Sequence, residues 1–599
     1  MTTTRQLPHW DMTVVYPNLD SPAFNQAFSQ AIQDINDLAS LFDTHHIQEQ
    51  PAPNVDDRDV QSAETIIARL NTILEQHTTL FTYINCFVDT NSHDTLAQAR
   101  LSEFQNALTL LSQLLTRFTA WIGSLDVESI IERSPLAREH TYMLRQAQQQ
   151  ARHLMSSPEE ELAAELNVSS GNAWARLHSN ITSQLAVPLE IDGQTRDYPM
   201  TEIRNMAFSP NRDLRRQAYE AELAGWQRTA VPLAAALNSI KNETNILCRR
   251  RKWSSPLDAS LFMNSIDRAT LDAMLSAARA SFPDFRRYLQ TKARLLGLPR
   301  LAWYDIDAPV VETDQVWEYD DAVHFIVEQF GTYSPRLSQF AARAFREHWI
   351  DAEPRPGKVG GAYCTEIMAD QSRILANFTP SYSGMSTLAH ELGHAYHNLN
   401  LVQRSPLQRI LPMTLAETAS IFCETIIRQA ALRTASKQGQ IAILEASLQD
   451  ACQIVVDITS RFLFEQNVFE KRQHRELSVE ELNSLMLDAQ RQTYGDGLDE
   501  TALHPYMWAV KGHYYSTGLS HYNYPYMFGL LFALGLYSQY QQDPETFKAG
   551  YDNLLASTGM ADATTLAARF GINLRSEDFW RSSLDIIRRD IDQLASLAE

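Results

Sequence analysis

The sequence predicts a mainly α-helical protein that contains a small amount of β-structure. Over most of the chain before about residue 180, apolar residues recur at three- and four-residue spacing with few Gly or Pro, as over 63–80 and 96–118. Residues that favour strands are confined to a few short stretches. With 599 residues, 44% of them hydrophobic, the chain can bury a large core.

The first strand-like stretch is LAVPLEIDGQTRDYPM, residues 185–200. It places Asp192 and Gly193 between two short β-prone runs, which predicts a hairpin. We expect this hairpin to close an N-terminal helical domain, residues 1–200. The second domain, residues 201–599, is then also helical and carries the motifs described below.

Helical periodicity continues over three further runs, 211–252, 268–296 and 319–349. The segment 351–384 differs because it is rich in Gly and Pro and contains two β-prone runs, 361–367 and 373–378. These short strands directly precede another helix, so they could supply an exposed sheet edge beside it. From residue 386 onward the pattern is helical again, except in a Gly- and Tyr-rich stretch at 511–525.

The charge balance argues against nucleic acid and membrane partners. The chain has 51 basic and 72 acidic residues, a net charge of −21, so attraction to nucleic acid phosphates or anionic lipid is not expected. The longest strongly apolar stretch, 526–537, is too short to span a bilayer. Five scattered cysteines and the lack of a visible export signal predict a cytoplasmic protein.

A possible metal site lies in the pentapeptide HELGH, which begins at His390. Residues four apart on a helix share a face, so His390 and His394 should point together. Glu391 lies about 100° round the helix, where it cannot join them easily but can reach a water beside them. Two imidazoles and an adjacent carboxylate in this spacing are the pattern of zinc peptidases. The same pattern also arises by chance in long helices.

A catalytic zinc needs a third protein ligand. The metzincin pattern does not supply it, because His397 stands where that pattern requires Gly and Asn400 where it requires His. Downstream, Glu417 and Glu424 lie seven apart on an expected helical run and should share one face. We expect Glu417 to bind the metal and Glu424 to hold a ligand imidazole from behind. The alternative is a solvated acidic face.

These motifs together resemble a known family. HELGHAYH followed by LAETASIFCE, preceded by GAYCTE, SRILANF and the opening WDMTVVYP, resembles the M3 zinc metallopeptidases, most closely their oligoendopeptidase F branch. The resemblance extends over essentially the full chain. It implies a prolate helical body with a deep central cleft, one zinc ion per chain at its floor, and hydrolysis of internal bonds in oligopeptides. It also implies the roles of five residues. His390, His394 and Glu417 would bind zinc, Glu391 would be the general base, and Glu424 would support a ligand imidazole from behind.

The family also uses a late His and Tyr residues to hold the substrate and stabilise the oxyanion. The stretch KGHYYSTGLSHYNYPYMFG offers several, and a Tyr hydroxyl or an imidazolium can donate to an oxyanion. The resemblance assigns catalytic roles to His513 and Tyr522, and substrate contacts to Tyr524 and Tyr526. Each of these tyrosines could instead be an aromatic residue that packs beside the cleft.

A peptide substrate could add as a strand to the sheet edge before the HELGH helix. The residues expected to contact it are Gly360, Gly361, Ala362 and Tyr363. Main-chain hydrogen bonds at such an edge do not depend on side-chain identity, which predicts broad sequence tolerance. Glycines allow close backbone approach, although a simple turn would explain Gly360 and Gly361 as well.

Two other functions remain open at this point. An enzyme that removes carboxyl-terminal dipeptides, or one that cleaves a particular larger protein, would share every zinc residue. A peptide-binding scaffold with an inert site belongs to a different class, and the intact set of His390, Glu391, His394 and Glu417 argues against it.

Overall fold

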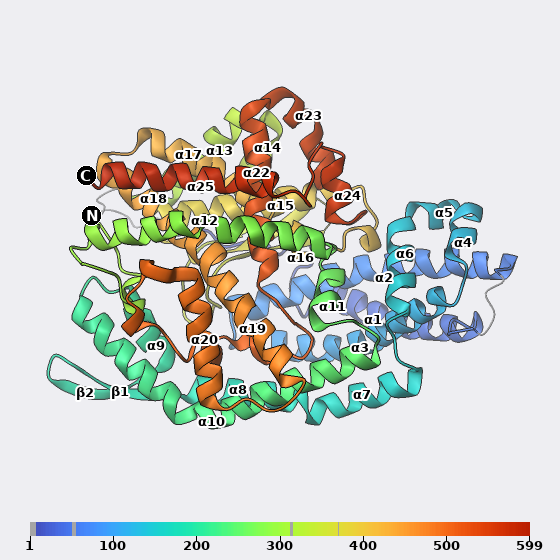
Figure 1. Cartoon of the computed structure of the whole chain (residues 1–599). Coiled ribbons are helices and arrows are strands. Elements are labelled where there is room, and N and C mark those ends of the chain that lie inside the picture. Colours follow the sequence, from blue (N-terminus) through green and yellow to red (C-terminus); the bar gives the residue numbers. More distant parts are fainter. Residues whose placement is uncertain (1–6, 51–54, 312–315, 369) are drawn as a thin grey trace. The chain divides into compact units, whose positions relative to one another are not determined.

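The computed structural model describes residues 7–50, 55–311, 316–368 and 370–599. It is mainly helical, as the sequence predicts (Figure 1). The chain forms two compact units, each built from three segments. The first unit comprises Met1–Leu154, Val316–Ala430 and Gln539–Leu566. The second unit comprises Met155–Gln315, Ala431–Ser538 and Ala567–Glu599.

The first unit is helical except for one small sheet. Its helices are α1 (Pro22–Thr44), α2 (Asp57–Thr90), α3 (Thr95–Gly123), α4 (Val127–Arg133), α5 (Pro135–Glu139), α6 (Thr141–Ala151), α13 (Tyr319–Tyr333), α14 (Pro335–Arg346), α15 (Tyr382–Leu401), α16 (Met413–Ala416), most of α17 (Ser420–Thr434), α23 (Pro544–Leu555) and most of α24 (Ala563–Ala568). Its strands are β3 (Ile350–Asp351), β4 (Tyr363–Met368) and β5 (Gln371–Leu375).

The sheet of the first unit has the order β3-β5-β4. The predicted strands at 361–367 and 373–378 are confirmed, with bounds shifted by one to three residues, and they pair antiparallel. Strand β4 lies at one edge of the sheet and packs against α2 and α15. The strands thus adjoin the HELGH helix, as expected.

The second unit contains the remaining helices and one hairpin. The helices are α7 (Ser157–Ser169), α8 (Gly171–Gln184), α9 (Met200–Asn205), α10 (Arg212–Arg250), α11 (Pro256–Met263), α12 (Arg268–Leu295), α18 (Lys437–Cys452), α19 (Ile458–Arg472), α20 (Val479–Tyr494), α21 (Met507–Val510), most of α22 (Tyr524–Gln542) and α25 (Glu577–Leu597). The hairpin is β1 (Ala186–Ile191) with β2 (Gln194–Pro199). Asp192 and Gly193 both have positive φ, as a type I′ turn requires, so the predicted hairpin is confirmed.

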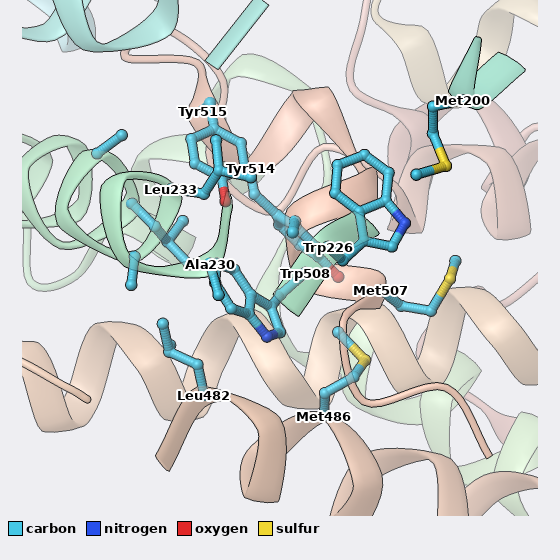
Figure 2. Packing of buried hydrophobic residues seen from close by; sticks show 14 of the residues in the cluster. Met200, Trp226, Ala230, Leu233, Leu482, Met486, Met507, Trp508, Tyr514 and Tyr515 are labelled. Atoms are coloured by element: carbon cyan, nitrogen blue, oxygen red, sulfur yellow. The ribbon is translucent and has the colours of Figure 1, made fainter. Parts of the chain in front are cut away.

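The core of the second unit forms around α10. Trp226 from α10 is buried together with Trp508, Tyr514 and Tyr515 from the late part of the chain. Figure 2 shows these aromatic residues packed with Leu482 and Met486 of α20. This packing holds the Gly- and Tyr-rich stretch after residue 510 against regular helices, so an irregular segment has fixed positions.

One predicted helical run is wrong. The run 319–349 is two helices, because α13 ends at Tyr333 and Pro335 begins α14. Proline has no N–H and disfavours helical conformation in the residue before it, while it suits the first turn of a new helix. Ser334 accordingly has extended φ and ψ, and its side chain caps α14.

Three further expectations concern the domain division, the overall shape with its cleft, and the absence of a membrane-spanning helix. The division after residue 200 stays a prediction; the compact units follow another division, in which the hairpin lies inside the second unit. The prolate shape and the central cleft also stay predictions. No helix within the described residues has both the length and the apolar character needed to cross a membrane.

Candidate active site

Helix α15 presents the two histidines of HELGH on one face. Its opposite face carries Leu388, Leu392 and Ala395, which are fully buried or nearly so, as expected for a helix packed on a core. The imidazoles of His390 and His394 have ring centroids 5.0 Å apart. Each side chain keeps about a quarter of its surface exposed, so the rings are accessible.

Glu417 joins the two histidines. Its Oε2 atom lies 3.3 Å from Nε2 of His390 and 3.3 Å from Nε2 of His394. The three donor atoms all lie within 4.8 Å of one another, a grouping that could hold a metal ion. Burial acts to raise the pKa of Glu417, but the hydrogen bonds to both imidazoles hold that pKa well below its usual range. The carboxylate is therefore ionised, as a metal ligand must be.

Glu417 does not lie on one continuous helix with Glu424, so that expectation is wrong. Helix α16 ends at Ala416 and α17 begins at Ser420, which leaves Glu417 in the turn between them. Ser420 Oγ donates a 2.7 Å hydrogen bond to Glu417 Oε2 and orients the carboxylate. Phe422 and Ile426 of α17 are nevertheless buried, as expected for a helix that packs on a core.

Gly393 allows this turn to approach α15. A Cβ atom at this position would lie 2.5 Å from Ser420 Cα and 2.6 Å from Ala419 O, both backbone atoms. Glycine inside a helix costs about 1 kcal/mol relative to alanine, so its presence in HELGH was a sign of close packing that the sequence analysis did not use. The close approach brings the turn, and with it Glu417, to the histidines.

We expect Gly393→Ala to lower both metal affinity and stability. The added methyl group must push the 417–420 turn away, which displaces the Glu417 carboxylate; overpacking of this kind costs about 1–3 kcal/mol. Urea unfolding and a zinc titration measure the two effects. Gly331→Ala in α13 is the matched control, since its Cβ would meet only ordinary contacts at 3.6 Å or more. Equal behaviour of the two variants would contradict the close-approach argument.

Glu424 lies behind His390. Its Oε2 atom is 3.1 Å from His390 Nδ1, and its Oε1 atom accepts a 3.3 Å hydrogen bond from Ser386 Oγ. A carboxylate accepts only, so Nδ1 of His390 donates to Glu424 and Nε2 donates to Glu417. Burial acts to lower the pKa of His390, but the hydrogen bonds to Glu417 and Glu424 raise that pKa well above its usual range. A metal ion would replace the proton on Nε2. This arrangement is the one expected when a carboxylate orients a ligand imidazole.

Glu391 is a buried carboxyl group next to the histidines. The residue is 5% exposed, and its Oε2 atom has no hydrogen-bond partner among the described residues. Burial raises the pKa of Glu391, although the nearby His390 and His394 oppose that shift. A carboxylate in this setting is a stronger base than one in water and has an unused acceptor.

The candidate oxyanion and substrate residues from the Gly- and Tyr-rich stretch lie in the second unit. Three of them form an aromatic cluster. His513 and Tyr522 have ring centroids 5.9 Å apart, and the hydroxyls of Tyr522 and Tyr526 are 2.6 Å apart. Tyr524 faces elsewhere: it is fully buried and its hydroxyl accepts a hydrogen bond from Ser260 Oγ. Its assignment as a substrate contact stays a prediction.

His513 is held by Asn523, a residue that the sequence analysis did not identify. Arg461 donates to Asn523 Oδ1 at 3.2 Å, which directs the Asn523 amide nitrogen toward His513 Nε2, 2.6 Å away. An amide nitrogen only donates, so Nε2 accepts and the ring proton of His513 is on Nδ1. Burial lowers the pKa of His513 to about 3, so the ring is a neutral Nδ1–H donor and not an imidazolium.

The residues before β4 are arranged as a loop that leads to the sheet edge. Gly361 has φ +81°, and a Cβ at Gly360 or Gly361 would meet nothing within 4 Å, so open space adjoins both. Asn377 Nδ2 donates to Gly361 O at 3.0 Å and anchors the loop. Tyr363 Oη donates to Asp89 Oδ2 at 2.7 Å, which fixes the first residue of β4.

Comparison with known proteins identifies the family. The model of peptidase family M3 matches residues 205–586, and a model described as oligopeptidase F matches residues 122–186. The chain belongs to peptidase family M3. As an M3 chain it is a metallopeptidase, a hydrolase of peptide bonds, and the predicted resemblance is confirmed.

Two similar proteins are named as oligoendopeptidase F or a homolog of it. The chromosomal oligoendopeptidase F of Lactococcus lactis subsp. cremoris is 26% identical over 65% of each chain. An oligoendopeptidase F homolog of Lactococcus lactis subsp. lactis is 22% identical over 98% of this chain and 97% of its own. A crystal structure of a protein assigned as a peptidase from Chlamydophila abortus has a TM-score of 0.82 at 20% identity and covers 98% of both chains, a likeness of fold.

Proposed function

We propose that this M3 peptidase is a zinc-dependent oligoendopeptidase that cleaves internal bonds of short peptides. The observation that carries the proposal is the convergence of His390, His394 and Glu417, with the buried Glu391 beside them. Two imidazoles and one carboxylate form a donor set of catalytic zinc sites, which leave the fourth position for water. The unpartnered Oε2 atom of Glu391 fits a group that contacts such a water.

The proposed mechanism divides the work among named groups. Zinc, when bound, lowers the pKa of a water to near neutrality and polarises the scissile carbonyl. Glu391 removes a proton from the attacking water as the carbon–oxygen bond forms, and it delivers that proton to the leaving amine as the carbon–nitrogen bond breaks. Glu424 keeps the His390 ring in the orientation that ligation needs.

His513 and Tyr522 are the proposed donors to the tetrahedral oxyanion. Each would contribute on the order of 3 kcal/mol if it behaves like other such donors. The hydrogen bond from Asn523 supports His513 in this role, because it leaves the Nδ1–H free to donate. Among the described residues no partner for that nitrogen is found. The neighbouring hydroxyl of Tyr526 can in turn orient Tyr522.

We further propose that the substrate binds as an added strand along β4. The edge position of β4 supports this, as does the open space beside Gly360 and Gly361, with Ala362 and Tyr363 continuing the edge. Main-chain hydrogen bonds would hold the peptide whatever its side chains. The five unpaired cysteine thiols support a reducing compartment, and we retain the cytoplasm as the expected location.

Product analysis on a ladder of peptides tests the proposed function. An oligoendopeptidase should cleave peptides whose carboxyl end is blocked as an amide and should release internal fragments of several lengths. Release of dipeptides alone, with no cleavage of the amidated series, would instead identify a dipeptidyl carboxypeptidase. Cleavage of one folded protein but of no short peptide would identify a specific protease. Metal-loaded chain that binds the ladder without cleaving it would identify an inert scaffold.

A further inference from the structure

The second unit contains a polar cavity of about 350 Å³, and its wall includes none of the groups assigned to metal binding, proton transfer or the oxyanion. Two ion pairs contribute to its wall, Arg204 with Glu222 and Arg461 with Asp457. Asp457 ends a π-helical turn, Gln453–Asp457, between α18 and α19. Such turns insert an extra residue into a helix and are frequent at functional sites. The wall of the cavity therefore combines two ion pairs with a π-helical turn.

Two further charged groups on the wall lack an ionic partner. The ammonium group of Lys511 makes no hydrogen bond or ion pair with any described residue. Asp307 accepts one hydrogen bond, from Gln449 Nε2 at 3.2 Å, and forms no ion pair with the described part of the chain. Both side chains are partly exposed although they lie in the unit's interior, which is consistent with their facing the cavity.

The pKa shifts of Asp307 and Lys511 also indicate that their charges lack full compensation. Burial raises the pKa of Asp307, with Lys292 and Arg204 opposing the shift. Burial and the neighbouring Arg461 lower the pKa of Lys511 to about 8. Both shifts disfavour the charged form, so the protein alone does not compensate either charge fully. A buried charge without a partner costs free energy that a bound counter-charge would recover.

We propose that this cavity binds a small zwitterion, an α-amino acid or a short peptide, with its carboxylate toward Lys511 and its ammonium group toward Asp307. A dicarboxylate would bring a second negative charge to Asp307, and a diamine would bring a positive one to Lys511. The volume lies at the lower end of the range for small-molecule sites, which suits an amino acid or a dipeptide.

This inference goes beyond the proposed peptidase function and does not depend on it. Every group involved lies in the second unit, and none belongs to the candidate metal ligands of the first unit. Binding at the cavity is therefore measurable whether or not the chain cleaves peptides.

Calorimetric titration of the zinc-loaded chain tests the proposal, with Glu391→Gln present to prevent turnover. The probes are alanine, alanylalanine, N-acetyl-alanylalanine and alanylalanine amide. We expect alanine or alanylalanine to bind with a dissociation constant of about 1 mM or below. Removing either terminal charge should weaken binding at least about tenfold, since hydrogen bonds to charged groups are lost. Comparison of alanine with alanylalanine distinguishes a free amino acid from a dipeptide as ligand.

Two variants locate the bound molecule. In Lys511→Met the amide should bind within about twofold of the free acid, and in Asp307→Asn the acetylated peptide should match the free amine. Lys471→Met and Asp272→Asn, exposed in the same unit, are matched controls that should keep the parent's discrimination. Thermal unfolding checks that each variant folds.

Three outcomes would overturn the proposal. The first is the absence of saturable binding by alanine and by alanylalanine, which means that the cavity holds only water. The second is equal affinity for the free and capped peptides, a result that needs no variant. The third is a dependence on the terminal charges that persists unchanged in Lys511→Met and Asp307→Asn, because the ligand would then lie elsewhere.

Discussion

Glu391→Gln should lower kcat for peptide hydrolysis by about 10³-fold, since general acid–base catalysis contributes roughly 10²–10⁴-fold. The amide has the shape of the carboxylate but cannot take a proton from water or return it to the leaving amine. None of the three candidate ligands changes, so bound zinc should remain at one ion per chain. Steady-state cleavage of a quenched fluorescent peptide and metal analysis of the same sample measure both quantities.

The control for this variant is Glu328→Gln, the same change on the exposed side of α13 in the first unit. It should retain the activity of the parent. Activity of Glu391→Gln at the parent rate, with zinc still bound, would show that Glu391 is not the base. Loss of zinc from the variant would show instead that Glu391 is needed for the metal site.

Glu417→Gln should weaken zinc binding by at least about 100-fold, because changes behind the ligands alone cost roughly 10–100-fold. The substitution removes the negative charge that lies 3.3 Å from both imidazole nitrogens. Competition with a chelator of known affinity measures the loss. Activity should fall in parallel and recover in part when zinc is raised.

Glu424→Gln provides a graded comparison. It changes only the group that accepts from His390 Nδ1, so its effect on zinc affinity should be smaller, about 10-fold to 100-fold. If Glu424→Gln lowered the affinity more than Glu417→Gln, the assignment of ligand and supporting carboxylate would have to be exchanged. Circular dichroism should show unchanged helix content in both variants, since neither side chain belongs to a hydrophobic core.

The parts of the fold that the sequence predicts are those set by local physical rules. Helix α15 follows from its apolar periodicity, and the spacing of His390 and His394 then places both imidazoles on one face. The β1–β2 hairpin follows from Asp192 and Gly193, which tolerate the positive φ of the turn. These features depend on neighbours in the sequence, so no tertiary information was needed.

The rest depends on contacts between distant segments. The break at Glu417 is stabilised by packing of its turn against Gly393, and periodicity around Glu417 alone suggests an unbroken helix. The hydrogen bond from Arg461 to Asn523, which directs Asn523 toward His513, joins segments that no local pattern relates. The same is true of Asp307 and Lys511, which meet at one cavity. Gly393 is the exception, since a glycine inside a helix signals a close neighbour without naming it.

The way the chain alternates between the two units bears on its synthesis. The first unit begins at the amino terminus but also requires Gln539–Leu566, so it lacks a segment until most of the polypeptide has left the ribosome. Domains that are contiguous in sequence can fold one after another during translation, whereas here neither unit can. Nascent chains of this protein should therefore expose apolar helix faces for longer, and depend more on chaperones, than nascent chains of equal length with sequential domains.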